Sequence, residues 1–225
     1  MNYTQLSANI QAYTENTESN FVAEIPVFVQ QAEQRIYNTV QFPSIRKNVT
    51  GVMSTGNKYL ACPTDFLAVY SMAVITDVTG GNLNTGTYEY LLNKDVNYIR
   101  QAYPVPNDTG EPKYYALFGP QSTNAAELSF IIGPTPDQNY NVELHYYYYP
   151  ESIVTAGTTW LGDNFDSVLL YGSLVEAYTY MKGEADIMAF YNTKYQEALA
   201  LAKRLGDGME RQDAYRSGQY RQKVT

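Results

Sequence analysis

The sequence is poor in the residues that bind metals and form cross-links. Its 225 residues include one cysteine, one histidine and one tryptophan. A single cysteine excludes a disulfide within the chain. Cys62 with His145 falls short of the ligand set of a usual zinc site, and no calcium-binding loop with aspartates at alternate positions is present. The sequence therefore predicts no metal ion and no other cofactor.

Long apolar runs and enzyme motifs are missing as well. No stretch of about 18 apolar residues occurs, so we expect no membrane-spanning helix, and residues 1–16 lack the basic start and apolar centre of a signal peptide. Phosphate-binding loops, dinucleotide-binding glycine motifs and nucleophile elbows are also missing. Cys62 and His145 are a formal catalytic pair, but no neighbouring residue indicates an activated thiol. We expect a protein that is made and assembled in a cytoplasm and is not an enzyme.

Tyrosine is abundant, with 23 residues against 8 phenylalanines. Tyrosine is favoured both in strands and at partly hydrated interfaces, because it combines a large contact area with a polar hydroxyl. Charge is unevenly distributed: residues 1–202 hold 9 Lys and Arg against 20 Asp and Glu, whereas residues 203–225 hold 6 against 3. The acidic body argues against tight nucleic-acid binding. The basic C-terminal segment predicts docking on an acidic protein surface.

Helical periodicity is found near both ends of the chain. Residues 3–13 predict a short helix, and residues 20–40 predict a longer one that begins or kinks at Pro26. The apolar face of the longer helix comprises Phe21, Ile25, Phe28, Ala32 and Ile36.

Two further helices are expected in the C-terminal third. Asp163 or Asn164 is expected to cap a helix that runs to about Lys182. This helix is apolar almost all round, so it needs neighbours on several sides, and Gly172 with Ser173 indicates a close backbone there. Residues 186–205 predict a last helix that ends at Gly206. Its apolar stripe comprises Met188, Tyr191, Tyr195, Ala198, Ala202 and Leu205.

The middle of the chain changes to the two-residue period of strands. Strands are expected at 49–53, 59–61, 68–76, 87–92, 114–118, 127–132 and 141–149, with a short helix at 94–103. The first two strands flank a turn and predict a hairpin. The fold class is therefore α+β: an antiparallel β domain, 48–150, is inserted into a helix bundle built from 1–47 and 151–205, and 206–225 follow as an extended tail.

Four consecutive tyrosines, residues 146–149, lie in the last expected strand. Consecutive strand residues point to opposite faces, so one pair of rings packs on the domain core. The other pair meets solvent, a sugar stacked on the rings, or another protein. A carbohydrate-binding or receptor-recognition module thus stands as the alternative to an assembly protein.

The sequence resembles the adaptor, or head-to-tail connector, proteins of tailed bacteriophages. The resemblance runs through segments that follow the family's order and spacing along this chain, none of which is a catalytic motif. These segments include GNKYLACPTDFL (56–67), GEPKYYALFG (110–119), TTWLGDNFDSVLLYGSLVEAYTYMK (158–182) and YNTKYQEALALAKRL (191–205).

The resemblance implies a structural role in the virion neck, between the capsid portal and the tail. Many copies, with twelve as the expected number, would form a ring around the channel through which genomic DNA passes without specific binding. The portal protein and the tail nozzle protein would be partners, assembly would take place in the host cytoplasm, and no membrane would be involved.

Two sets of residues are candidates for these contacts. The C-terminal segment is expected to dock on the portal through Arg211, Tyr215, Arg216, Tyr220 and Arg221. Contacts between neighbouring subunits are expected at Tyr171, Leu174, Tyr178, Tyr146 and Tyr148.

Overall fold

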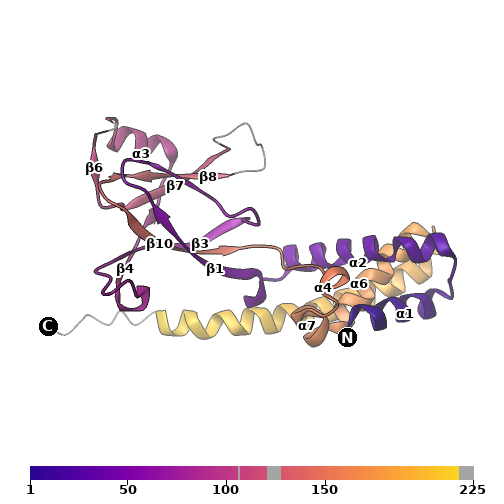
Figure 1. The fold of residues 1–225 in the computed structure, drawn as a ribbon. Coiled ribbons are helices and arrows are strands. Elements are labelled where there is room, and N and C mark those ends of the chain that lie inside the picture. Colours follow the sequence, from indigo (N-terminus) through magenta and orange to yellow (C-terminus); the bar gives the residue numbers. More distant parts are fainter. Residues whose placement is uncertain (106, 121–127, 218–225) are drawn as a thin grey trace. The chain divides into compact units, whose positions relative to one another are not determined.

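The computed structural model describes residues 1–105, 107–120 and 128–217. The chain forms two compact units (Figure 1). Met1–Ile45 and Tyr149–Thr225 make up a helical unit, and Arg46–Tyr148 make up a β-rich unit. The β-rich unit is thus inserted between two parts of the helical unit. Helices together with mainly antiparallel sheets confirm the predicted α+β class.

The helical unit contains α1 (Tyr3–Thr14), α2 (Ser19–Thr39), α4 (Ile153–Ala156), α5 (Trp160–Asn164), α6 (Asp166–Tyr180) and α7 (Ala185–Ser217). All five residues of the predicted apolar face of α2 are buried, and Pro26 lies inside this helix rather than at its start. The predicted cap of α6 at Asp163 or Asn164 is wrong, because both residues lie in another helix. This separate short helix, α5, precedes α6, and the Thr159 hydroxyl caps α5 by accepting from the Gly162 N–H at 3.2 Å.

Helix α6 lies at the centre of the helical unit, where it packs against α1, α2, α5 and α7. Its own unit therefore supplies the neighbours that its apolar surface requires. A Cβ atom on Gly172 would lie 3.3 Å from the Ala32 Cβ of α2 and 3.2 Å from the Tyr195 ring of α7. A close approach at Gly172 is present, but the nearest atoms belong to side chains rather than to a backbone as expected. It brings two helices against the same turn of α6.

Helix α7 continues to Ser217, so the predicted end at Gly206 is wrong, as is the extended conformation expected for residues 206–217. The rest of the expected tail, 218–225, lies outside the described residues. Gly206 is a packing position instead of a cap. A Cβ atom there would lie 3.2 Å from both the Gln41 carbonyl oxygen and a methyl of Val40, just beyond α2. The close packing outweighs the cost of about 1 kcal/mol that glycine brings to a helix interior.

The β-rich unit contains two four-stranded sheets. One has the order β1 (Arg46–Met53), β10 (Tyr140–Tyr147), β3 (Ala68–Thr76) and β4 (Thr87–Tyr90), with every pair antiparallel. The other has the order β2 (Tyr59–Ala61), β8 (Ser129–Gly133), β7 (Tyr114–Gly119) and β5 (Leu92–Asn93). Side chains of both sheets form one core, which includes Met72, Val74, Tyr115, Phe130, Val142 and Leu144.

The predicted hairpin between β1 and β2 is wrong, because the two strands belong to different sheets. The connection carries the chain from one sheet to the other and is held by distant groups. The Gly56 N–H donates to the Pro136 carbonyl at 2.8 Å, and the Thr55 N–H donates to the Asn139 side chain at 2.9 Å. These contacts replace the tight turn that would have paired the strands.

Short parallel pairs depart from the expected antiparallel pattern: β5 with β7, and β6 (Thr109–Gly110) with β9 (Thr135–Pro136). Helix α3 (Val96–Ala102) packs on β7 and β8, where Ile99, Ala116 and Ile131 form a second, smaller core. None of the helices in the described ranges is long and apolar enough to cross a membrane.

Candidate functional site

Cys62 and His145 do not have the surroundings of a catalytic pair. Burial raises the pKa of the Cys62 thiol to about 12, so the reactive thiolate is scarce near neutral pH. His145 lies on β10 with its ring 4.9 Å from the Tyr70 ring, and burial together with the Arg46 charge lowers its pKa. Within the described ranges, no group of three or more His, Cys, Asp or Glu side chains is placed to hold a metal ion.

The tyrosine run changes from buried at Tyr146 through half-buried at residues 147 and 148 to exposed at Tyr149, rather than forming one exposed platform. Tyr146 is 1% exposed in the β-rich core, and its hydroxyl donates to the Asp65 carboxylate at 2.7 Å. Tyr148 is half-buried, with the Lys47 ammonium 5.2 Å from its ring centre. No feature of this run favours stacking against a sugar over packing against protein.

The remaining residues expected at subunit contacts lie on α6. Leu174 is 0% exposed, so its side chain is enclosed by its own unit. Tyr171 and Tyr178 are half-buried, and their rings lie 6.5 and 4.9 Å from the ring of Tyr191 on α7. The Tyr178 hydroxyl also donates to the Tyr13 carbonyl at 3.2 Å. The structure thus gathers these tyrosines where α1, α6 and α7 meet, with part of their surface open.

A second apolar stripe on α7 was not predicted. Phe190, Leu201 and Leu205 are 55, 67 and 53% exposed, and their spacing places them on one side of the helix. The Lys194–Glu197 ion pair lies on the same side, between Phe190 and the two leucines. The expectation that Leu205 belongs to the buried stripe is wrong, because that stripe passes through Leu199 instead. The signal available in the sequence was the i, i+4 pair of leucines at 201 and 205.

The expected portal-docking residues occupy the C-terminal part of the chain. Residues 211, 215 and 216 lie within the helical backbone of α7. Tyr220 and Arg221 lie outside the described residues.

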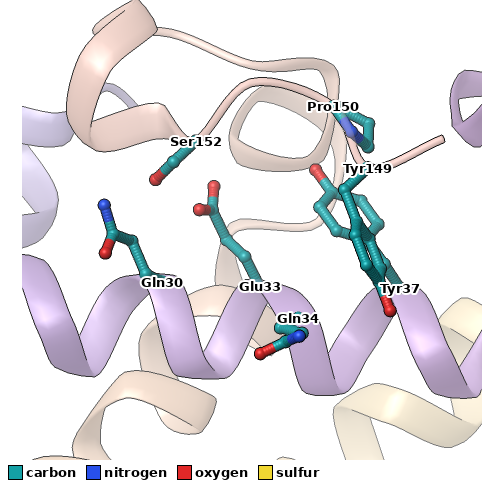
Figure 2. A pocket seen from close by; sticks show the side chains of 7 residues that line it. All are labelled: Gln30, Glu33, Gln34, Tyr37, Tyr149, Pro150 and Ser152. Atoms are coloured by element: carbon teal, nitrogen blue, oxygen red, sulfur yellow. The ribbon is translucent and has the colours of Figure 1, made fainter. Parts of the chain in front are cut away.

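A pocket lies where the chain returns from the β-rich unit and crosses α2 (Figure 2). One wall is a single face of α2, and the other is the returning segment. The cavity measures about 180 Å³ and is lined by Gln30, Glu33, Gln34, Tyr37, Tyr149, Pro150 and Ser152. The four α2 residues follow the i, i+3, i+4, i+7 spacing of one helix face. Sequence reasoning missed the pocket, since its second wall comes from a segment more than a hundred residues later.

Glu33 is the buried charge of this pocket, with only 3% of the residue exposed. Its carboxylate rises from α2 toward Ser152, between Gln30 and the ring of Tyr149 (Figure 2). It accepts from the Ile153 N–H at 2.9 Å. Burial raises the pKa of Glu33, although hydrogen bonds from Ser152 and Ile153 partly oppose this rise. The Tyr149 hydroxyl donates to the Asn38 side chain and fastens the returning segment a second time.

Comparison with known proteins agrees with the resemblance carried by the sequence. No curated protein matches the chain. The family described as SU10 adaptor protein matches residues 1–222, which covers both units and the C-terminal helix. The chain therefore belongs to the SU10 adaptor protein family, a family of bacteriophage adaptor proteins.

Proposed function

We propose that this protein is the subunit of an adaptor ring of twelve copies in the virion neck. The ring joins the portal protein to the tail nozzle protein and lines the channel through which DNA leaves the capsid. Subunits are made and assembled in the host cytoplasm, and the protein carries out no reaction. Family membership along residues 1–222 supports the adaptor role.

The exposed apolar stripe of α7 is the observation that carries the ring proposal. Phe190, Leu201 and Leu205 are each more than half exposed, and aligned exposed apolar side chains are typical of protein contact surfaces. A closed ring needs two different surfaces on each subunit, one for each neighbour. We assign the α7 stripe to one of them and the half-buried Tyr171 and Tyr178 to its surroundings. Tyr148 is a further candidate in the β-rich unit.

The charge distribution supports the channel and the portal contact. Residues 1–202 carry the acidic excess, and an acidic wall lets DNA slide without adhering. The basic residues are concentrated in residues 203–225. We propose that Arg211, Arg216 and Arg221, together with Tyr215 and Tyr220, dock on acidic groups of the portal, since arginine pairs with carboxylates through two parallel hydrogen bonds.

The proposal is tested by mixing the protein with purified portal rings and weighing the product by native mass spectrometry. The expected product is a portal ring that carries a fixed number of adaptor copies. Leu201→Glu should reduce the number of bound copies, because it places a charge within the apolar stripe. Portal rings that gain no mass from the wild-type protein would contradict the adaptor function itself.

Ala200→Glu is the matched control for Leu201→Glu. Ala200 is exposed on α7 and lies one residue away, on the side of the helix that faces neither the core nor the stripe. Ala200→Glu adds the same charge to the same turn of α7 as Leu201→Glu. Portal complexes of Ala200→Glu should therefore keep the wild-type mass. Equal losses in both variants would show that charge on α7, rather than the stripe, governs assembly.

A further inference from the structure

We propose that the pocket between α2 and the returning segment binds the guanidinium group of an arginine side chain presented by another protein chain. Glu33 supplies the negative charge, Gln30 and Gln34 supply carboxamide oxygens, and the rings of Tyr37 and Tyr149 form the flat walls. This assignment goes beyond the adaptor role, because it rests on the pocket alone and requires neither a ring nor a portal.

The charge of Glu33 is the first argument. The carboxylate is buried, yet no lysine or arginine lines the pocket, and none of the ion pairs in the described ranges includes Glu33. Arg35, two residues along α2, pairs with Glu176 of α6 instead. Buried charges are ordinarily paired, because leaving water without a partner is costly. A cation from outside the chain would provide that partner.

The remaining hydrogen-bonding capacity is the second argument. An ionised carboxylate offers about four acceptor positions. The Ile153 N–H and the Ser152 side chain account for two interactions. A guanidinium group carries five N–H donors in a planar fork and binds carboxylates through two parallel bonds. Gln30 and Gln34 also line the pocket, and the carboxamide oxygen of each can accept a further hydrogen bond.

The size and walls of the pocket favour arginine over lysine. Its volume of about 180 Å³ corresponds to roughly six water molecules at about 30 Å³ each, which gives room for a planar group and its adjoining methylenes. The overlapping rings of Tyr37 and Tyr149 lie on the side of Glu33 away from Gln30 (Figure 2), and guanidinium groups stack on aromatic faces. An ammonium group is compact and cannot use such a wall in the same way.

Glu33 also has a role within its own chain, and the two roles can be separated. It accepts from the Ile153 N–H at the first residue of α4 and thereby secures that helix to α2. Glu33→Gln keeps a side-chain oxygen that accepts from this N–H but removes the negative charge. Glu24→Gln removes a charge from α2 outside the pocket and serves as the matched control.

The test is a titration of the full-length protein with N-acetyl-arginine amide, followed by NMR. We expect saturable binding with a dissociation constant on the order of 1–10 mM, with shifts at Gln30, Gln34 and Tyr149. N-acetyl-lysine amide should bind more weakly. Glu33→Gln should weaken arginine binding about tenfold or more while its thermal unfolding stays close to that of the wild type, and Glu24→Gln should bind like the wild type.

Two results would overturn the proposal: no saturable binding of N-acetyl-arginine amide by the wild-type protein, or equal binding by Glu33→Gln. Because the titration contains no portal, its failure leaves the adaptor function untouched. Failure of portal binding, in turn, leaves the pocket assignment untouched.

Discussion

Shortening Leu174 tests whether α6 is the centre of the helical unit. Leu174 on α6 is 0% exposed, whereas Leu201 on α7 is 67% exposed. Leu174→Ala and Leu201→Ala delete the same atoms from a helix, so they differ only in surroundings. Three buried carbons at about 0.8 kcal/mol each give a transfer loss of about 2.4 kcal/mol.

The neighbours of α6 decide how much the cavity adds to this loss. On the opposite side of α6 from Leu174, a Cβ atom on Gly172 would lie only 3.2–3.3 Å from Tyr195 and Ala32. A shift of α6 into a cavity at Leu174 would therefore break this close packing. We therefore expect Leu174→Ala to lower the free energy of unfolding by about 3–4 kcal/mol, within the range for buried leucines. Leu201→Ala should change it by less than about 0.5 kcal/mol.

Trp160 provides an assay that reports on the helical unit. It is the single tryptophan of the chain and lies in α5, with its ring 5.3 Å from Phe42 and 5.4 Å from Phe165. Its fluorescence during urea unfolding should therefore follow the loss of this packing. With a urea slope of about 2 kcal/mol per molar, the expected loss moves the Leu174→Ala midpoint down by about 1.5–2 M. A shift under about 0.5 M, or an equal shift in Leu201→Ala, would refute the central position of α6.

The β-rich unit and the C-terminal segment offer three further tests. Burial alone would raise the pKa of Asp65, but hydrogen bonds from Lys47 and Tyr146 hold it below its ordinary value. This stabilisation is present above the unfolded-state pKa of about 4 and is lost as the pH falls through the lower folded-state pKa. The free energy of unfolding of Asp65→Asn should therefore fall less steeply in acid than that of the wild type, and an equally steep fall would contradict this. Because burial raises the pKa of Cys62 to about 12, a disulfide reagent should modify the folded protein far more slowly than the urea-unfolded protein. Equal rates would show that the fold does not protect the Cys62 thiol. Truncation after Gly206 should leave a folded protein that no longer binds portal rings, and wild-type affinity in a pull-down would remove the docking role of the segment.

Local patterns in the sequence predicted individual elements well. The bounds of β3 agree with the expected strand at 68–76, and the apolar residues of α2 recur at helical spacing because they all face one core. The close approach at Gly172 was also predictable, since glycine in a helix interior has a local cost that packing must offset. These features depend on neighbours within a few turns or residues, so the sequence carries them directly.

Features that depend on distant partners could not be predicted. Strand β1 pairs with β10, almost a hundred residues later, and no turn motif encodes that choice. Gly206 has the sequence signature of a helix end, but Val40 and Gln41 make it a packing position. The Glu33 pocket likewise requires the returning segment to reach α2. Strand β10 ends at Tyr147, so only the first two tyrosines of the run lie in a strand, and the burial of Tyr146 depends on Phe66 and Asp65 from another part of the chain.

The place of α6 in the chain order has a consequence for synthesis on the ribosome. Helices α1 and α2 emerge first, but the helix that covers their apolar faces follows roughly 130 residues after Thr39. At about 5–20 residues per second, this delay lasts on the order of ten seconds. During that time α1 and α2 lack the helix that covers their apolar faces. The β-rich unit is synthesised in the same interval and leaves the ribosome before α6 does. Nascent chains should therefore recruit a holding chaperone through α2, and release it when α6 arrives.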